Sequence, residues 1–172
     1  IPGDEHRYGQ QLWLDRDPGL LLRSDIVDDQ RRVIERYQFA AIDIGVTFAD
    51  SDFQWPDEAG VTLIPPQAES SDNQPPLAWA PAWLPDGFRE STRKVVEGAG
   101  VQTYSDGLAS FSLFVEAVQQ DPMPDMSNRW GATSAVVRHQ SNAESSYRIT
   151  VVGEIPVATA RRIAWSVAYK EN

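Results

Sequence analysis

The side chains best suited to chemistry are few, and they form no known catalytic pattern. Histidine occurs twice in the 172 residues, as His6 and His139, and cysteine is absent. The sequence contains no Walker-type phosphate loop, no HExxH and no GxSxG. Asp106 and His139 are the candidates for a hydrolase, an alternative that requires a cleft with two titratable groups within hydrogen-bonding reach. The leading interpretation is a protein that is not an enzyme and has no catalytic residue.

Metal and cofactor sites are equally weakly supported by the residue pattern. Without cysteine, a structural zinc site would need to be built mainly from carboxylates, which is unusual. The spacing Asp15-x-Asp17-x-Gly19 is similar to the start of a calcium loop, but the sixth and twelfth positions are Leu20 and Ile26 rather than Gly and Glu. We therefore predict a β-turn here, and neither a metal nor a cofactor for the chain.

The charge distribution excludes some partners and predicts a linker. With 15 basic and 25 acidic residues, the net charge is −10, which disfavours nucleic acid and anionic membrane surfaces as partners. Residues 51–78 hold five acids, five prolines and no base. That composition is typical of a solvated linker. The predicted organisation is a first part at 1–50, a linker at 51–78 and a small domain at 79–172.

The elements around this linker predict an α+β fold. Residues 8–14, 20–27 and 33–44 have the pattern of a three-stranded antiparallel meander. Such a sheet has an uncovered face and open edges, so we expect it to be the tail of a larger sheet and to favour a homo-oligomer. The strand at 20–27 is expected to offer an edge for pairing with an extended partner segment.

The second part has the pattern of a small antiparallel sheet covered by one helix. Strands are predicted at 88–97, 101–105, 109–118, 131–139 and 146–152. A helix is predicted to begin with Pro156 as its first residue, because its missing N–H costs nothing there. Its apolar stripe is predicted from the spacing of Val157, Ala160, Ala164 and Val167.

Aromatic side chains are the most informative residues of this second part. Phe111 and Trp165 are expected in the core, because large aromatics dominate small cores. For Trp79 and Trp83, which are flanked by prolines and the linker, a core and an interface position both stay open.

Four ordered blocks carry a family resemblance. They are residues 8–25 (YGQQLWLDRDPGLLLRSD), 83–88 (WLPDGF), 104–116 (YSDGLASFSLFVE) and 150–156 (TVVGEIP), followed by Thr159 and Ala160. Together they resemble the C-terminal part of the MucB/RseB family, periplasmic negative regulators of an envelope-stress sigma-factor pathway. The resemblance covers nearly the whole chain and is weakest in the linker.

The resemblance implies a fold and a function. It implies that residues 1–50 are the last strands of a large half-barrel domain similar to LolA and LolB, followed by a small sheet-plus-helix domain. It implies periplasmic binding of a membrane anti-sigma factor similar to MucA or RseA, shielding of that partner from proteolysis, and release by lipid or lipopolysaccharide. A lipid or lipoprotein carrier of the LolA/LolB type is the alternative, and it requires a continuous apolar concavity.

The expected partner-binding residues belong to the small domain. Trp83, Phe88 and Arg89 are the predicted anchors, because Trp and Arg are enriched at binding hot spots and all three precede or begin the first predicted strand. Arg93 and Arg148 lie on predicted strands and are further candidates for contacts with acidic partner residues.

The linker assignment makes a direct prediction for limited proteolysis. Because residues 51–78 are predicted to form no core of their own, a protease of broad specificity should cleave there first. Mass spectrometry of the earliest fragments checks this. First cleavage inside 100–117, with 51–78 intact, would contradict the assignment.

Overall fold

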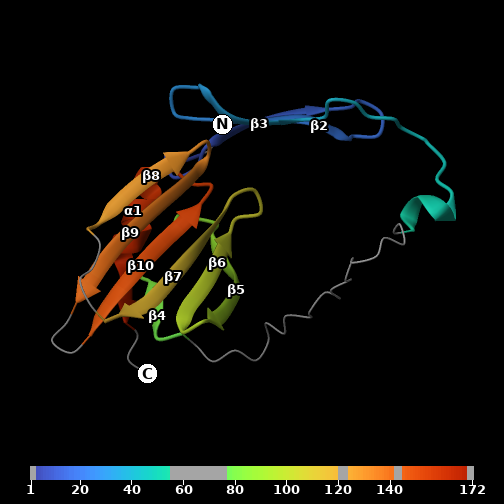
Figure 1. Ribbon diagram of the computed structural model, residues 1–172. Coiled ribbons are helices and arrows are strands. Elements are labelled where there is room, and N and C mark those ends of the chain that lie inside the picture. The colour runs from blue at the N-terminus through green and yellow to red at the C-terminus, as the bar shows by residue number, and fades with distance from the viewer. Residues whose placement is uncertain (1–2, 55–76, 120–123, 142–144, 170–172) are drawn as a thin grey trace.

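The largest sheet among the described residues is six-stranded and antiparallel (Figure 1). The computed structural model describes residues 3–54, 77–119, 124–141 and 145–169. The strand order is β5-β6-β7-β10-β9-β8. These strands are β5 (Arg89–Val96), β6 (Ala99–Ser105), β7 (Ser110–Val118), β8 (Met126–Trp130), β9 (Thr133–Ser141) and β10 (Ser146–Gly153).

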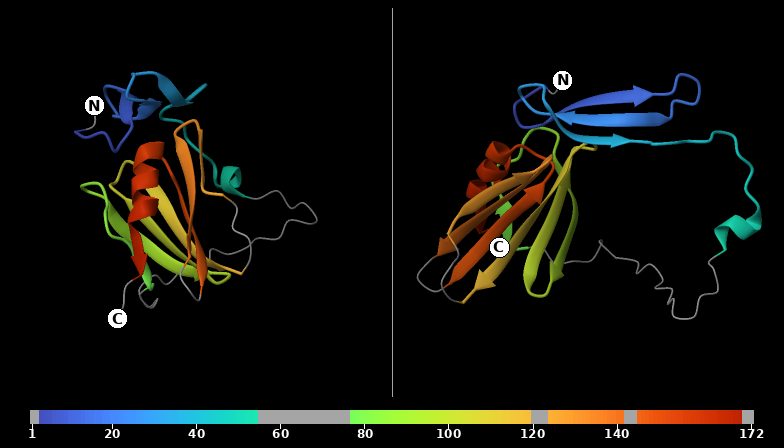
Figure 2. Two further views of the ribbon diagram at one scale, coloured as in Figure 1. Left: turned by 90° about the vertical axis from the view of Figure 1, so that its left-hand side faces the viewer. Right: turned by 45° about the horizontal axis from the view of Figure 1, so that its top comes forward.

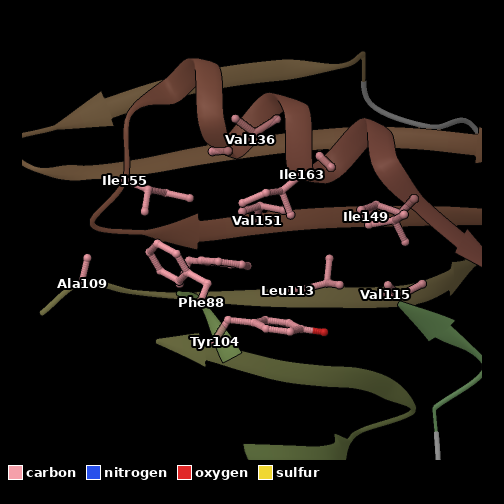
Figure 3. Packing of buried hydrophobic residues seen from close by; sticks show 14 residues of the cluster. Phe88, Tyr104, Ala109, Leu113, Val115, Val136, Ile149, Val151, Ile155 and Ile163 are labelled. Carbon is pink, nitrogen blue, oxygen red and sulfur yellow. The ribbon is translucent and has the colours of Figure 1, made fainter. Parts of the chain in front are cut away.

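One face of this sheet is covered by α1 (Val157–Ser166), which packs on β9 and β10 (Figure 2). Apolar residues alternate along the strands, so that Leu113, Ile149 and Val151 are fully buried beneath the helix (Figure 3). Their burial removes apolar surface from water on both elements at once. Gly153 lies opposite Phe111, and a Cβ on it would meet the Ser110 carbonyl oxygen at 2.3 Å. A glycine is therefore required at this position of β10.

A short two-stranded ribbon completes the small domain. It pairs β4 (Trp79–Pro81) with β11 (Val167–Tyr169), the segments that begin and end this part of the chain. The ribbon was not predicted, because each strand has three residues and its partner is distant in sequence. It changes the position of Val167, which belongs to β11 rather than to the helix and is 4% exposed.

The predicted helix stripe needs two further corrections. Pro156 is the residue that caps the helix rather than its first residue, and its carbonyl oxygen accepts the first helical hydrogen bond, from the Ala160 N–H, at 2.9 Å. Val157 is only half-buried. The buried positions are Thr159, Ala160, Ile163 and Ala164.

The second sheet consists of β1 (Gly9–Leu14), β2 (Leu21–Val27) and β3 (Val33–Gln38), in the order β1-β2-β3. It lies across the end of the six-stranded sheet at which β8 joins β9 (Figures 1 and 2). The predicted meander is present, but its third strand ends at Gln38 rather than at 44. The residue pairing with β2 ends at Arg23 opposite Gln38, and one further backbone hydrogen bond, from the Phe39 N–H to the Leu22 carbonyl oxygen at 3.2 Å, follows it. A one-turn helix, η1 (Asp50–Phe53), follows.

The middle position of β2 corrects another expectation. Because β2 pairs with both neighbours, the strand predicted at 20–27 has no free edge for a partner. Among the described residues, the open edges of this sheet belong to β1 and β3. Asp25 of β2 is 1% exposed, and the hydrogen bonds from Arg23 and Arg36 hold the pKa of its carboxyl well below the ordinary range.

The α+β class and the antiparallel architecture are confirmed. The strand β8 was missed, because all five of its residues are exposed and show no apolar alternation. The predicted linker lies largely outside the described residues, and the division into 1–50, 51–78 and 79–172 stays a prediction. The expected core position of Trp165 is wrong, because its side chain is 46% exposed beneath the Arg138 guanidinium. Phe111 is buried, as expected.

The ribbon gives a testable prediction for Val167. Substitution Val167→Asp places an unpaired charge in the core and should lower the free energy of unfolding by about 3 kcal/mol. Val95→Asp is the matched control, because Val95 is 52% exposed on β5. Chemical denaturation of both variants measures the difference. Equal stabilities for the two variants would contradict the placement of Val167 in the core.

Candidate functional site

Arg7 fixes the N-terminal segment to the small domain. Its Nε donates a hydrogen bond to Asp106 Oδ2 at 2.6 Å, and its other nitrogens donate to Asp4 and to the Asp86 carbonyl oxygen. The guanidinium lies 5.1 Å from the centre of the Phe88 ring. One side chain therefore joins residues from three separate stretches of chain, with charge-assisted bonds and a cation–π contact.

Asp106 is held as a carboxylate by the turn that contains it. Burial would raise its pKa, but hydrogen bonds from the Ala109 N–H, from Arg7 and from the Leu108 N–H outweigh this and lower the pKa below 3.8. The two N–H···Oδ1 distances are 2.8 Å to Ala109 and 2.9 Å to Leu108. Gly107, at the tip of the turn, has φ 93°, which a residue with a side chain rarely adopts.

Glu35 makes a second contact between the two sheets. Its Oε2 accepts a hydrogen bond from the Ala132 N–H at 2.9 Å, in the turn between β8 and β9. Gly131 precedes that bond at φ 58°, and a Cβ there would lie 2.9 Å from Glu35 Oε2. The Tyr37 hydroxyl donates to Glu35, and these hydrogen bonds from Tyr37 and Ala132 lower the pKa of the carboxyl.

A hollow of about 820 Å³, the junction cleft, opens beside these contacts. Its walls come from residues 4–11, from residues 27–32 and from the first turns of α1, together with Arg129 of β8. Most of the lining side chains are charged or polar. Two further hollows in the described part of the chain have volumes of about 260 and 230 Å³.

Trp83 is half-buried, and its contacts with two of the lining residues place it at the rim of this cleft. Its indole makes an edge-on contact with His6 at 5.0 Å, and the Arg162 guanidinium lies 3.8 Å from the ring centre. The backbone N–H of Trp83 donates a hydrogen bond to Ser166 Oγ at 3.3 Å, which ties this segment to the end of α1. Both residues that touch the indole, His6 and Arg162, line the cleft.

The other two predicted anchors have different surroundings. Phe88 is 5% exposed and packs between Phe111 and Arg7, so its ring is occupied within the chain. Arg89 is exposed and forms no ion pair with any residue in the described ranges. The structure thus brings Trp83 and Phe88 to neighbouring residues, His6 and Arg7. Whether a partner contacts any of the three anchors stays a prediction.

The remaining sequence candidates are engaged elsewhere. Arg93 pairs with Glu90 at 2.5 Å, and Arg148 pairs with Glu116, directly across from it, at 2.8 Å. His139 lies 3.4 Å from Asp125. Neither Asp106 nor His139 lines the junction cleft, and the structure does not bring them together.

Sequence reasoning missed the residues that shape the cleft. His6, Arg31, Arg129 and Arg162 come from four segments separated by long stretches of chain. No local motif connects them, so no pattern in the sequence could have grouped them. Within the described residues, no cluster of three or more His, Asp or Glu side chains is placed to hold a metal ion. No helix in that part of the chain has the length and apolar composition to cross a membrane.

The Asp106 contact makes a prediction about pH. The pKa of the Asp106 carboxyl is lower in the folded protein than its ordinary value of 3.8. Such a carboxyl stabilises the fold at pH values above 3.8, and the stabilisation is lost as the pH falls through the pKa of the folded state. Asp106→Asn should therefore lower the free energy of unfolding by about 2 kcal/mol at pH 7, because it removes a charged partner of Arg7. The deficit should shrink below pH 3.8.

The control for this experiment is Asp17→Asn. Asp17 is exposed in the turn between β1 and β2. Denaturant titrations at several pH values should show little change for this variant. A deficit for Asp106→Asn that does not depend on pH would contradict the proposed charge interaction.

Comparisons with known proteins identify the family to which the chain is similar. The family model described as the MucB/RseB C-terminal domain matches residues 73–168, and the MucB/RseB N-terminal domain model matches residues 1–57. The Sigma factor AlgU regulatory protein MucB of Pseudomonas aeruginosa is 35% identical over 173 residues, which is 96% of this chain and 53% of that protein. The Sigma-E factor regulatory protein RseB of Haemophilus influenzae is 29% identical over 181 residues, covering 99% of this chain and 53% of that protein.

A solved structure agrees with these sequence matches. The crystal structure of MucB in complex with MucA(peri) superimposes with a TM-score of 0.80 and 32% identity, over 99% of this chain and 60% of that one. The chain spans about half the length of the curated relatives it matches. The resemblance found in the sequence is confirmed: this chain belongs to the MucB/RseB family.

Proposed function

We propose that this chain is part of a sigma-factor regulator that acts by binding the periplasmic domain of a membrane anti-sigma factor. The observation that carries the proposal is the match, over 99% of the chain, to MucB in its complex with MucA(peri). The names of the curated relatives, which describe regulatory proteins of sigma factors, support it. A periplasmic location and a role without catalysis are parts of the same proposal.

The junction cleft and Trp83 are the proposed binding surface. Tryptophan is among the residues most enriched at binding hot spots, and a half-buried indole loses little side-chain entropy on binding. His6 and Arg162 already hold its ring in place. A preorganised aromatic side chain at the rim of a large cleft suits capture of a polypeptide segment. Arg89, exposed on β5, is the second proposed anchor on the small domain.

Phe88 has an indirect part in this proposal. Because its ring is buried beneath Arg7, it supports the position of the N-terminal segment and thus of the cleft wall. We propose that its substitution weakens partner binding by loosening this wall.

The shielding of the partner and its later release are the finer steps of the proposal. A regulator bound to an extended segment of an anti-sigma factor excludes a protease from that segment, which is the proposed shielding. Lipid or lipopolysaccharide is the proposed signal for release.

Two observations bear on the other proposals. Most of the residues that line the junction cleft are charged or polar, and an acyl chain there would desolvate their polar ends, so a regulator is favoured over a lipid carrier. Large apolar side chains are exposed on the three-stranded sheet and beyond it, among them Leu14, Tyr37, Phe39 and Phe53. They support the proposal of a homo-oligomer, in which a second copy covers this apolar surface.

Calorimetry tests the binding function. The purified periplasmic domain of MucA should bind the chain, and Trp83→Ala should raise Kd about tenfold or more, because an anchor at the cleft rim is removed. Trp165→Ala is the matched control, since Trp165 also lies beneath an arginine, but that arginine, Arg138, does not line the cleft, whereas Arg162 over Trp83 does. Circular dichroism confirms that both variants fold. Equal affinities for Trp83→Ala and the unaltered chain would contradict the assigned anchor, and no binding by the unaltered chain would contradict the function.

A further inference from the structure

The charge of the junction cleft is opposite to that of the chain. Five arginines and four acidic residues line it, so the cleft carries a small positive excess in a protein of net charge −10. An acidic protein that gathers a third of its 15 basic side chains around one hollow concentrates positive potential there.

Internal ion pairs account for only part of these charges. Arg7 pairs with Asp4, and Arg32 pairs with Asp28. The three other lining arginines, Arg31, Arg129 and Arg162, have no carboxylate partner among the residues that the structure describes. Glu5 and Asp29 are the acidic residues of the lining that no ion pair of the described ranges includes. Three guanidinium groups are thus available to a ligand.

Each of the three arginines is carried by a different, well-defined element. Arg31 occupies a turn closed by Asp28, whose carbonyl oxygen accepts the Arg31 N–H at 3.0 Å. Arg129 lies on the edge strand β8 and donates to the Gly131 carbonyl oxygen at 3.1 Å. Arg162 lies on α1 above the Trp83 ring. The helix adds its own N-terminal residues, Val157 and Ala158, to the lining, and their N–H groups also favour a negative ligand.

From this arrangement we infer that the junction cleft binds an acidic, extended segment of the partner polypeptide, whose carboxylates pair with Arg31, Arg129 and Arg162. The inference rests on the proposed function and adds the chemistry of the segment that is recognised. Guanidinium groups bind carboxylates through paired, directional hydrogen bonds, so they confer register as well as affinity.

The wall opposite the helix favours a polypeptide. Residues 9–11 of β1 line the cleft, and among the described strands β1 has a neighbour on one side only. An extended segment can satisfy the free backbone groups of such an edge, as in β-augmentation. A single phosphate is far smaller than a cleft of about 820 Å³. An anionic membrane would be repelled by the rest of this acidic chain.

The test uses the purified MucA periplasmic domain as the probe and the double variant Arg31→Glu/Arg129→Glu. Both arginines are exposed, so folding should be preserved, and circular dichroism checks this. Arg162 is left unchanged because it also supports Trp83. Charge reversal at both positions should raise Kd by about tenfold or more and reduce its dependence on salt.

Two control variants make the comparison specific. Arg16→Glu reverses the charge of an exposed arginine at the other end of the three-stranded sheet, outside the cleft lining, and should leave Kd within about twofold. The double variant Arg31→Lys/Arg129→Lys keeps both positive charges and should retain most of the affinity. If it binds and the Glu double variant does not, the loss of affinity comes from the lost charge and not from misfolding.

The outcomes distinguish the two proposals. Binding by the unaltered chain, together with weakening confined to the Glu double variant, supports the inference. Equal binding by the unaltered chain and the double variant overturns the inference and leaves the proposed function standing. No binding by the unaltered chain overturns both. Loss of phosphatidylglycerol vesicle binding in the double variant, with MucA binding unchanged, assigns the cleft to a membrane surface and also overturns the inference.

Discussion

The contact of Arg7 with Asp106 determines where the N-terminal segment lies, and the cleft depends on that position. A single guanidinium bonds to Asp4, Asp106 and the Asp86 carbonyl oxygen while it covers Phe88. The carboxylates of Asp4 and Asp106 are partly withdrawn from water, which strengthens their charge-assisted bonds relative to exposed ones. The bond from Ala132 to Glu35 is a second, separate attachment. Two attachments restrict rotation of one sheet against the other more than one can.

The core of the small domain supplies the rigid side of this junction. The helix buries Ile163 and Ala164 against the sheet, and its ends are tied by the Pro156 cap and by the β4–β11 ribbon. Ser166, at the end of the helix, holds the Trp83 backbone. The exposed groups at the cleft are therefore mounted on elements whose positions are set by buried apolar contacts.

A regulator that masks a peptide needs a complementary surface rather than a reactive group. The junction provides one from parts that are ordinary when taken singly: a cleft, an aromatic rim and arginines that pair with no carboxylate of the described residues. Electrostatic complementarity of this kind speeds association and selects register more than it raises affinity. In a chain of net charge −10, a positive hollow also discriminates among partners, because acidic segments are repelled from most of the remaining surface.

The sequence by itself determined the elements whose signal is local. The alternation of apolar residues identified β7, β9 and β10, the turn at Asp106 and Gly107 was evident from its residue types, and four ordered blocks identified the family. Arg93 and Arg148 were also visible, but their carboxylate partners were not, since a cross-strand pair such as Arg148 with Glu116 depends on strand register.

Only the tertiary structure decided the rest. The exposed strand β8 and the ribbon of β4 with β11 have no periodicity to read and exist because a distant strand offers hydrogen bonds. Trp165 was expected in the core because it is a large aromatic residue, yet it is 46% exposed, since the turn of the helix brings Ile163 and Ala164 to the sheet instead. The cleft joins Arg31, Arg129 and Arg162 across more than a hundred residues of chain. Their proximity is a consequence of how the two sheets pack, and that packing cannot be predicted from the local sequence around each arginine.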